Sequence, residues 1–491
     1  MEQYIIALDQ GTTSSRALAF DSKGNLVGGV NKEFTQIFPQ PGWVEHDPYE
    51  ILQSQMGALF ELLKKYSISG DKIKAIGITN QRETVVVWDK NSNKPLYNAI
   101  VWQCRRTSDY CQELKEKGYE DMIRKKTGLV IDAYFSASKI KWILENATKE
   151  STTNFLCGTI DSWLIYNMTK EKSHVTDMSN ASRTMLFNIE SLDWDQELLD
   201  LFQIPKHMLP TIVSSSEIVG HIEIDGYDIP IAGIAGDQQA ALFGQTCFLQ
   251  GDVKNTYGTG CFILMNTGNK PVFSNKGLLT TIAWNLNDET SYALEGSIFN
   301  AGSSITWLKD QLGLIESAEQ TESMALSVED TQDVYFVPAF TGLGTPYWDM
   351  YARALFIGMT RGTNKNHMVR AVLESMAYQT SDVIETMEEE AQTKIKCLYV
   401  DGGASRNNFL MQFQADILST QVSRPKIQDT TALGAAFLAG LAVGFWKDID
   451  ELKMLVGADK TFIPDDNVNR IGLKKRWHQA ILRSKNWSSS N

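Results

Sequence analysis

The first side chains that could do chemistry follow an apolar, β-branched run at residues 5–8, which predicts a buried strand. Asp9 ends that run, and residues 10–15 form a small, hydroxyl-rich turn that leads to Arg16. A carboxylate fixed at a strand end can hold a hydrated Mg²⁺ ion. The N–H groups and hydroxyls of the turn, with a guanidinium nearby, can surround phosphate oxygens. An ordinary β-hairpin with a polar tip explains the same residues, so this stretch alone leaves both interpretations open.

A second group of candidates could bind a hydroxylated ligand. Arg82 and Glu83 follow a strand predicted at residues 73–79, and such a pair offers donors and acceptors to hydroxyl groups. Trp102 and Tyr134 could pack against the carbon chain of that ligand. A surface ion pair with unrelated aromatic residues remains the simpler interpretation of the spacing alone.

Asp237 stands at the turn between a strand predicted at residues 231–235 and a helix predicted at residues 239–245, and two glycines precede it within five residues. A carboxylate at such a turn can act as general base for a hydroxyl group that attacks a phosphate. It can equally serve as the N-cap of the following helix. The local sequence leaves both roles open.

Gly402 and Gly403 follow a strand predicted at residues 397–400, and Asn407 precedes a helix predicted at residues 408–418. Two adjacent glycines allow the backbone to approach a planar ligand such as adenine closely. A tight turn and a helix start explain the same residues, so the glycine pair is a candidate nucleotide contact and no more.

Between these turns, strands alternate with helices along the chain. A strand that ends in Asp beside glycine or hydroxyl residues recurs near residues 9, 237 and 401, with a related turn at residues 256–260. Further helices are predicted at residues 47–66, 136–146 and 430–446, the first with Asp47 as N-cap. A chain of 491 residues is too long for one core. We therefore predict an α/β protein of two domains, residues 1–248 and 249–491, whose turns meet across a cleft.

Composition argues against several other classes of protein. The net charge of -13 is opposite to the basic surface of a nucleic-acid-binding protein. The six cysteines form no CxxC pair, which is typical of a protein whose thiols stay reduced. The six histidines form no HExxH motif, which argues against a structural zinc site. Neither GxxxxGK[ST] nor GxGxxG occurs, so any phosphate site uses another architecture.

Membrane insertion and secretion are not expected. The N-terminus carries Glu2 and enters a strand at once, so we expect no signal peptide. The longest uncharged stretch, residues 430–446, is Gly- and Ala-rich and is only about one helix long. The sequence therefore predicts a cytoplasmic protein.

Longer motifs along the chain resemble one family. They are DQGTTSSR (9–16), PGWVEHDP (41–48), NQRET (80–84), YFSASKIKWILEN (134–146), NASRTMLFNI (180–189), GIAGDQQAALFGQ (233–245), NTYGTGCF (255–262), PYWD (346–349), ALFIGMTRGTNKNHMVRAVLE (354–374) and DGGASRNNFLMQFQADIL (401–418). In this order they span essentially the whole sequence. The sequence resembles the glycerol kinase branch of the FGGY carbohydrate kinase family, within the actin/Hsp70/hexokinase-like ATPase superfamily.

The resemblance implies two ribonuclease H-like (actin-like ATPase) domains that flank a deep catalytic cleft. It implies phosphorylation of glycerol to sn-glycerol 3-phosphate by ATP with Mg²⁺, in glycerol uptake and catabolism, with Asp237 as general base. The residues matched to glycerol contacts are Arg82, Glu83, Trp102, Tyr134, Asp237, Gln238 and Phe262. Those matched to nucleotide contacts are Thr12, Thr13, Ser14, Arg16, Thr259, Gly302, Thr306, Gly403 and Asn407. Those matched to the metal are Asp9 and, through water, Asp237.

The segment before the GDQQ motif differs from that of the family members whose activity is regulated there. Those members bind fructose 1,6-bisphosphate through an Arg-containing loop before the GDQQ motif, or carry a phosphorylatable histidine there. Residues 220–230 read GHIEIDGYDIP, without Arg and with acidic side chains, so we expect neither mechanism. His221 is expected to be an ordinary surface histidine. The family also implies a homodimer or homotetramer.

Two alternatives to glycerol phosphorylation stay open at this stage. One is another small-polyol or ketose kinase of the same family. The other is an actin- or Hsp70-like protein that uses ATP to switch a binding surface.

Overall fold

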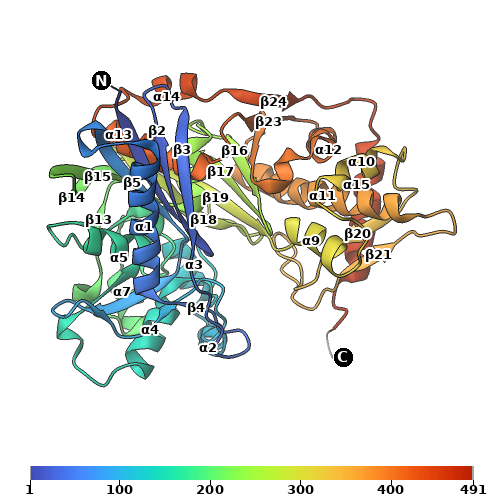
Figure 1. Ribbon diagram of the computed structural model, residues 1–491. Coiled ribbons are helices and arrows are strands. Elements are labelled where there is room, and N and C mark those ends of the chain that lie inside the picture. Colours follow the sequence, from blue (N-terminus) through green and yellow to red (C-terminus); the bar gives the residue numbers. More distant parts are fainter. Residues whose placement is uncertain (1, 489–491) are drawn as a thin grey trace.

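Two large β-sheets lie side by side in the structure, a computed structural model that describes residues 2–488 (Figure 1). The first sheet has six strands in the order β14-β15-β5-β1-β2-β3. Their bounds are β1 Tyr4–Gln10, β2 Ser14–Phe20, β3 Leu26–Glu33, β5 Ile73–Asn80, β14 Ser216–Ile224 and β15 Tyr227–Gly236. β1 pairs in parallel with β5 and antiparallel with β2, which places the strand that ends at Asp9 and Gln10 in the centre of the sheet.

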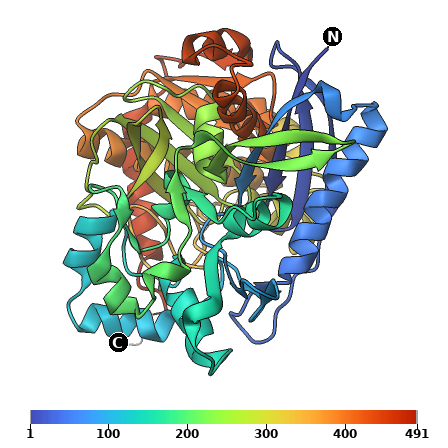
Figure 2. The same ribbon diagram turned by 90° about the vertical axis from the view of Figure 1, so that its left-hand side faces the viewer.

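Helices cover both faces of this first sheet. Ile6 and Leu8 of β1 pack in one cluster with α1 (Pro48–Tyr66), which runs along the outer side of the sheet (Figure 2). Ile5 and Ala7 face the opposite way and pack with α13 (Thr430–Ala442). Successive side chains of a strand point to opposite faces, so a strand covered on both sides needs a continuous apolar run. This explains why residues 5–8 do not alternate between apolar and polar.

The second sheet has seven strands in the order β18-β19-β17-β16-β22-β23-β24. Their bounds are β16 Val253–Tyr257, β17 Cys261–Gly268, β18 Leu279–Leu286, β19 Glu289–Ile298, β22 Cys397–Asp401, β23 Gln421–Pro425 and β24 Ala458–Phe462. Ile263 and Met265 pack in one cluster with α11 (Lys365–Ala391) and α12 (Asn408–Leu418), whereas Leu264 packs in another with α8 (Asp237–Gly244). The centre of this sheet at β17 is therefore also buried on both faces.

α8 and α13 cross between the two sheets, and glycines allow the close approach. A Cβ atom added to Gly434 of α13 would lie 1.8 Å from the carbonyl oxygen of Ala240 in α8. A Cβ atom on Gly244 of α8 would lie 2.0 Å from the carbonyl oxygen of Thr430. A helix near the end of the chain thus packs against the first sheet and fixes it to the second.

A smaller sheet and several short helices extend the first sheet at the lower left of Figure 1. Its strands are β4 Glu45–His46, β6 Val85–Asp89, β7 Lys94–Pro95, β8 Ala99–Ile100 and β9 Phe155–Thr159. The helices of this half are α2 Ser108–Glu116, α3 Glu120–Thr127, α4 Ser136–Asn146, α5 Ile160–Met168, α6 Met178–Ala181 and α7 Gln196–Phe202. This region carries Trp102, Tyr134 and Arg183, which return in the site below.

The remaining elements of the described residues include small sheets and further helices. Three two-stranded sheets are formed by β10 Val175–Asp177 with β13 Thr211–Val213, β11 Phe187–Asn188 with β12 Asp193–Trp194, and β20 Tyr335–Val337 with β21 Leu355–Ile357. The other helices are α9 Gly302–Asp310, α10 Gln320–Leu326, α14 Ile449–Leu455 and α15 Arg470–Ser484.

The main elements predicted from the sequence are confirmed, with shifted ends. α1 begins at Pro48, and its predicted N-cap Asp47 accepts a hydrogen bond from the Tyr49 N–H at 2.8 Å. The helix predicted at residues 239–245 begins two residues earlier, at Asp237, and the one predicted at residues 430–446 ends at Ala442. Within residues 2–488, no helix is long and apolar enough to cross a membrane.

Candidate active site

The turn after β1 brings the first predicted phosphate residues together. Gly11 N–H donates to the Ser14 carbonyl at 2.9 Å, and Asp9 lies directly opposite Arg16 in the β1–β2 pairing. The Arg16 guanidinium forms an ion pair with Asp9 and another with Asp429 at 2.7 Å. The charge of Asp9 raises the pKa of Arg16 further above its usual range. Arg16 is thus fixed at the base of the turn by two carboxylates, one of which the sequence did not indicate.

Five charged side chains, which we call the polar cluster, converge beside this turn. They are Arg82, Glu83, Arg183, Asp237 and Glu295. Arg82 Nε lies 3.2 Å from Asp237 Oδ1, and Arg82 Nη1 lies 2.5 Å from Glu295 Oε2. Arg183 Nε donates to Glu83 Oε1 at 2.6 Å, and Arg183 Nη2 donates to Glu295 Oε1 at 3.0 Å. The interpretation of Arg82 and Glu83 as a surface ion pair is wrong, because their side chains are only 3% and 1% exposed.

Glu83 adopts a backbone conformation that is rare for its residue type. Its φ is 60°, and the Thr84 N–H donates to the Arg82 carbonyl at 2.7 Å across it. Non-glycine residues in this left-handed region are strained by about 1–3 kcal/mol and concentrate at functional sites. The tight turn aims the Glu83 side chain back toward the polar cluster.

The carboxylates of the polar cluster differ in their electrostatics. Burial raises the pKa of Asp237, although the charges of Arg82 and Lys254 oppose that rise. Burial likewise raises the pKa of Glu83. Burial would also raise the pKa of Glu295, but the guanidinium groups of Arg183 and Arg82 outweigh it and lower that pKa to about 2. Asp237 therefore has a raised pKa, unlike Glu295, and its side chain is still 30% exposed, so it can reach a ligand.

Asp237 is not the N-cap of α8, so the alternative interpretation of this residue is wrong. Gly236 occupies the N-cap position of α8, and Asp237 is the first helical residue. Its Oδ1 accepts a hydrogen bond from the Gln238 N–H at 2.7 Å. The carboxylate therefore lies at the positive end of the helix, where an anion is stabilised.

Three aromatic side chains, which we call the aromatic cluster, lie next to the polar cluster. The ring of Trp102 makes edge contacts with Tyr134 at a centroid distance of 5.5 Å and with Phe262 at 6.4 Å. The Trp102 indole N–H also donates to Thr12 Oγ1 at 3.0 Å. Burial raises the pKa of Tyr134, and the negative charge of Glu83 raises it further, so the hydroxyl group stays protonated. The aromatic residues predicted to flank a ligand are thus joined to the turn predicted to bind phosphate.

Lys254 connects the helix that carries Asp237 to the second sheet. Its Nζ donates to Gln238 Oε1, to Thr256 Oγ1 at 2.9 Å and to the Phe262 carbonyl at 3.3 Å. These three acceptors use all three donors of an ammonium group. Burial lowers the pKa of Lys254 to about 8. Lys254 therefore holds Gln238 and Phe262, both predicted ligand contacts, in fixed positions.

The remaining predicted nucleotide residues gather at one end of the second sheet. The Thr259 carbonyl at the tip of the β16–β17 turn accepts hydrogen bonds from Ala301 N–H at 2.9 Å and Ser303 N–H at 3.1 Å, which brings α9 with Gly302 and Thr306 beside it. Gly402 packs against the backbone of Tyr257, so the turn at Gly403 lies next to the same hairpin.

The helix-start interpretation of Asn407 is correct, because its side chain caps α12 by accepting from the Leu410 N–H at 2.9 Å. A Cβ atom on Gly403 would meet no heavy atom within 4 Å, so this backbone is open to a ligand. The capping bond uses Asn407 Oδ1, and Asn407 Nδ2 donates a second hydrogen bond to Thr321 Oγ1 at 3.1 Å.

Asp9 and Asp237 are the two predicted carboxylates that could hold a Mg²⁺ ion together with water and phosphate ligands. Asp9 is 4% exposed and its charge contributes to the raised pKa of Asp237, so the two carboxylates act on each other through space. Among the described residues there is no group of three or more His, Cys, Asp or Glu side chains that could hold a metal ion. Mg²⁺ usually binds one or two carboxylates and keeps waters or substrate phosphates as its other ligands.

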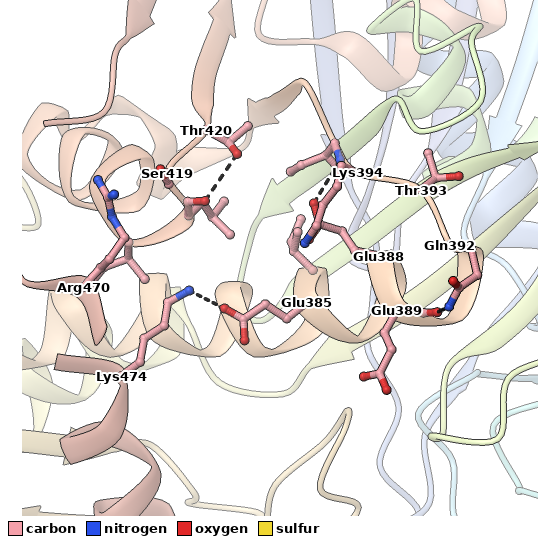
Figure 3. A pocket seen from close by; sticks show the side chains of 14 residues that line it. Glu385, Glu388, Glu389, Gln392, Thr393, Lys394, Ser419, Thr420, Arg470 and Lys474 are labelled. Carbon is pink, nitrogen blue, oxygen red and sulfur yellow. Dashed lines mark hydrogen bonds and ion pairs between the residues drawn. The ribbon is translucent and has the colours of Figure 1, made fainter. Parts of the chain in front are cut away.

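A separate hollow lies at the C-terminal ends of α11 and α12. Its volume is about 730 Å³, and Figure 3 shows the charged side chains that line it. Lys474 pairs with Glu385, and Lys394 pairs with Glu388. The hollow contains none of the predicted site residues.

The region before Asp237 carries surface ion pairs. His221 is 39% exposed and its Nδ1 lies 2.9 Å from Glu171 Oε1, which makes it a surface histidine as predicted. Glu223 and Asp228 both pair with Lys170.

Sequence reasoning missed several residues of the site. They are Lys139, Arg183, Lys254, Glu295 and Asp429. Lys139 is fully buried, and its Nζ donates to the carbonyls of Ala133, Tyr134 and Phe135, which fixes the loop that carries Tyr134. Glu295 carried one available signal, a charged residue directly after the apolar run Tyr292-Ala293-Leu294. Lys254 lies among polar residues in β16, so its local sequence carries no such signal.

Comparison with known proteins identifies the family of this chain. Residues 4–244 match the model of the FGGY family of carbohydrate kinases, N-terminal domain, and residues 253–443 match its C-terminal domain. The chain belongs to the FGGY family of carbohydrate kinases.

Its relatives within that family include named kinases. It is 61% identical to the glycerol kinase of Pseudothermotoga lettingae and 59% identical to glycerol kinase 2 of Thermotoga maritima, each over 99% of both chains. A crystal structure of Plasmodium falciparum glycerol kinase with ADP superimposes with a TM-score of 0.93 at 39% identity, over 98% of both chains. Gluconate kinase from Lactobacillus acidophilus superimposes with a TM-score of 0.88 at 27% identity, also over 98% of both chains.

Proposed function

We propose that this chain transfers the γ-phosphoryl group of ATP to the primary 3-hydroxyl group of glycerol, giving sn-glycerol 3-phosphate in glycerol catabolism. The observation that carries the proposal is the 3.2 Å contact between Arg82 Nε and Asp237 Oδ1. It places the carboxylate of Asp237 beside a guanidinium that can donate to hydroxyl groups and near the aromatic cluster. The relatives named glycerol kinase at 61% and 59% identity support glycerol as the substrate. The ADP-bound structural relative supports the nucleotide.

Asp237 acts as the general base in this mechanism. Its carboxylate accepts the proton of the attacking hydroxyl group as the oxygen bonds to phosphorus and the β–γ bridging bond breaks. The raised pKa of Asp237 suits this role, because it makes the carboxylate a stronger base. Arg82 and Glu83 hold the hydroxyl groups that do not react, and positioning of this kind supplies a large part of the rate. Trp102 and Phe262 pack against the carbon atoms.

The phosphate groups are held by both turns. Thr12, Thr13 and Ser14 belong to the first, and Thr259 belongs to the second, while Gly302, Thr306, Gly403 and Asn407 contact the nucleotide. Asp9 and, through water, Asp237 would hold Mg²⁺, which when bound neutralises charge on the phosphate oxygens. Closure of the two halves around the substrates would exclude water from the phosphoryl group.

Asp237→Asn tests the proposed base. The amide keeps the size of the side chain but cannot accept the proton, so we expect kcat to fall by about 10²–10⁴-fold while glycerol binding stays measurable. A coupled assay of ADP release measures kcat, and calorimetry measures binding. A kcat near that of the wild-type protein would remove Asp237 from this role.

A substrate panel tests the choice of glycerol against the alternatives. ADP release is measured with glycerol, dihydroxyacetone, xylulose and gluconate. We expect the highest kcat/KM with glycerol. A preference for xylulose or gluconate would indicate another kinase of the family, and slow ATP hydrolysis without activity on any of the four would favour an ATP-driven switch.

We also propose that the protein acts in the cytoplasm as a homodimer or homotetramer. Exposed aromatic side chains support an interface: Phe299, Trp348 and Tyr351 are 42%, 44% and 48% exposed, and Phe299 contacts Trp348. Light scattering after size exclusion measures the mass directly. A single species at the chain mass of 55.0 kDa would contradict the assembly.

A further inference from the structure

Glu295 is a carboxylate in a place where one is costly. It lies on β19, is 0% exposed and follows Tyr292, Ala293 and Leu294 in a buried part of the strand. Burial of a charge is unfavourable unless oppositely charged partners compensate for it. The residue lies in the range matched by the C-terminal family domain, whereas its two partners, Arg82 and Arg183, lie in the range matched by the N-terminal domain.

The donors of Arg82 show what Glu295 does. Arg82 Nη1 donates to Glu295 Oε2 at 2.5 Å and Nη2 donates to Glu295 Oε1 at 3.2 Å, so the carboxylate holds the end of the guanidinium with two bonds. Nη1 also donates to Gln239 Oε1 at 3.2 Å, and Nε faces Asp237. A guanidinium has five N–H donors, so one on Nη2 remains for a ligand hydroxyl group. The direction of that donor depends on the bidentate pair with Glu295.

Glu83 depends on the same carboxylate through a second arginine. Arg183 Nη2 donates to Glu295 Oε1, and Arg183 Nε donates to Glu83 Oε1 at 2.6 Å. This leaves Glu83 Oε2 as the oxygen that no described residue engages in a hydrogen bond. One carboxylate therefore orients both members of the Arg82–Glu83 pair.

We propose that Glu295 is a positioning residue for the glycerol site. Its carboxylate orients Arg82 directly and Glu83 through Arg183, without itself contacting the substrate. This inference rests on the proposed function, in which Arg82 and Glu83 bind the hydroxyl groups that do not react. Because Glu295 comes from the second half of the chain, the hydroxyl-binding pair of the first half is complete only when β19 is in place.

Glu295→Gln tests the proposal by removing the charge while keeping the shape. The amide cannot accept from both Nη atoms of Arg82, so we expect the KM for glycerol to rise on the order of 10- to 100-fold, the range for loss of a hydrogen bond to a charged group. The KM for ATP should change by no more than about twofold, as for a separate site. An unchanged KM for glycerol, or an equal rise in both KM values, would overturn the proposal.

Propane-1,2-diol supplies a readout that a merely structural role would not move. It keeps the 2-hydroxyl group but lacks the second terminal hydroxyl group of glycerol, one of the two non-reacting groups that Arg82 and Glu83 would hold. We expect the ratio of kcat/KM for glycerol to that for propane-1,2-diol to fall about 10-fold in Glu295→Gln, since the variant loses the contact that the diol never makes. An equal loss of activity on both substrates would indicate a general structural defect and overturn the proposal.

Two further variants separate positioning from stability. Glu295→Asp keeps the charge and should give a KM for glycerol between those of the wild type and Glu295→Gln. Glu295→Gln combined with Arg183→Met removes one charge of each sign, so its Tm should exceed that of Glu295→Gln while its KM for glycerol stays high. Recovery of KM together with Tm would overturn the proposal.

Glu374→Gln is the matched control, because Glu374 is 4% exposed and pairs with Arg370 at 2.8 Å outside the polar cluster. It should lower Tm and leave the KM for glycerol unchanged; a raised KM in this control would also overturn the proposal. Failure of the proposed function is a separate outcome. Wild-type protein that does not phosphorylate glycerol refutes that function, whereas active wild type with an unaffected Glu295→Gln refutes only the role of Glu295.

Discussion

The crossing of α8 and α13 predicts that a single added methyl group will disturb both folding and catalysis. Gly434→Ala places a Cβ atom 1.8 Å from the Ala240 carbonyl oxygen and 2.9 Å from the Gly244 nitrogen. Ordinary contacts of this kind begin at 3.4 Å, so the helices must separate by about 1.6 Å, and the atoms in the way are backbone atoms that cannot rotate aside. Asp237 is the first residue of α8, so the displacement reaches the proposed general base.

The expected magnitudes follow from this displacement. Overpacking costs about 1–3 kcal/mol, and replacement of a helical glycine by alanine returns about 1 kcal/mol. With the upper value for overpacking, about 3 kcal/mol, the net loss in the free energy of unfolding is about 2 kcal/mol. For a chain of this size, such a loss lowers Tm by roughly 2–5 °C. A shift of about 1 Å at a catalytic group can reduce the rate 10²-fold, so we expect kcat to fall by about 10- to 100-fold.

Scanning calorimetry and the ADP-release assay measure the two effects on the same preparation. Gly57→Ala is the matched control, since Gly57 also lies within a helix but its added Cβ would meet only the flexible side chain of Lys32, at 3.1 Å. That control should keep the wild-type kcat and a Tm at or above the wild-type value. Wild-type Tm and kcat in Gly434→Ala would refute the argument that this crossing positions Asp237.

Two further predictions concern the nucleotide turn and acid stability. Gly403→Ala should leave Tm unchanged and raise the KM for ATP, because its Cβ atom meets no protein atom within 4 Å but faces the proposed nucleotide. Gly402→Ala should lower Tm, because φ at Gly402 is 86° and the added Cβ atom would lie 2.4 Å from the Tyr257 carbonyl oxygen. Equal effects of the two changes on Tm and KM would contradict this. Burial lowers the pKa of His46 to about 4, below the 6.5 of the unfolded chain, so stability should fall as pH drops from about 6.5 to about 4. His46→Gln should make the fall of Tm over that window shallower, and an unchanged slope would rule out His46 as a contributor.

The parts of the fold that could be predicted from the sequence are those set by neighbouring residues. The apolar run before Asp9 and the Asp47-Pro48 start of α1 each carry their signal within a few positions, and both elements form as expected. The proposed roles of Arg82 and Asp237 came from family motifs, because local sequence left each with two interpretations.

The parts that could not be predicted depend on residues far apart in the chain. Glu295 contacts Arg82 across 213 positions, and no local pattern specifies which buried cation a buried carboxylate will meet. The packing of α13 on the first sheet is of the same kind: its Gly- and Ala-rich composition predicts a closely packed helix but not the sheet that receives it. The predicted domain boundary at residue 248 stays a prediction, although α13 shows that the second half contributes to the core of the first.

The position of α13 also has a consequence for how the protein is made. Ribosomes add about 5–20 residues per second, so roughly 200 residues and about 10–40 s separate the completion of β15 from the completion of α13. During that interval the face of β1 that carries Ile5 and Ala7 has no cover from α13. The first half of the chain is therefore an incomplete folding unit until residue 442 emerges. A chain that stops near residue 248 is expected to aggregate through this exposed face.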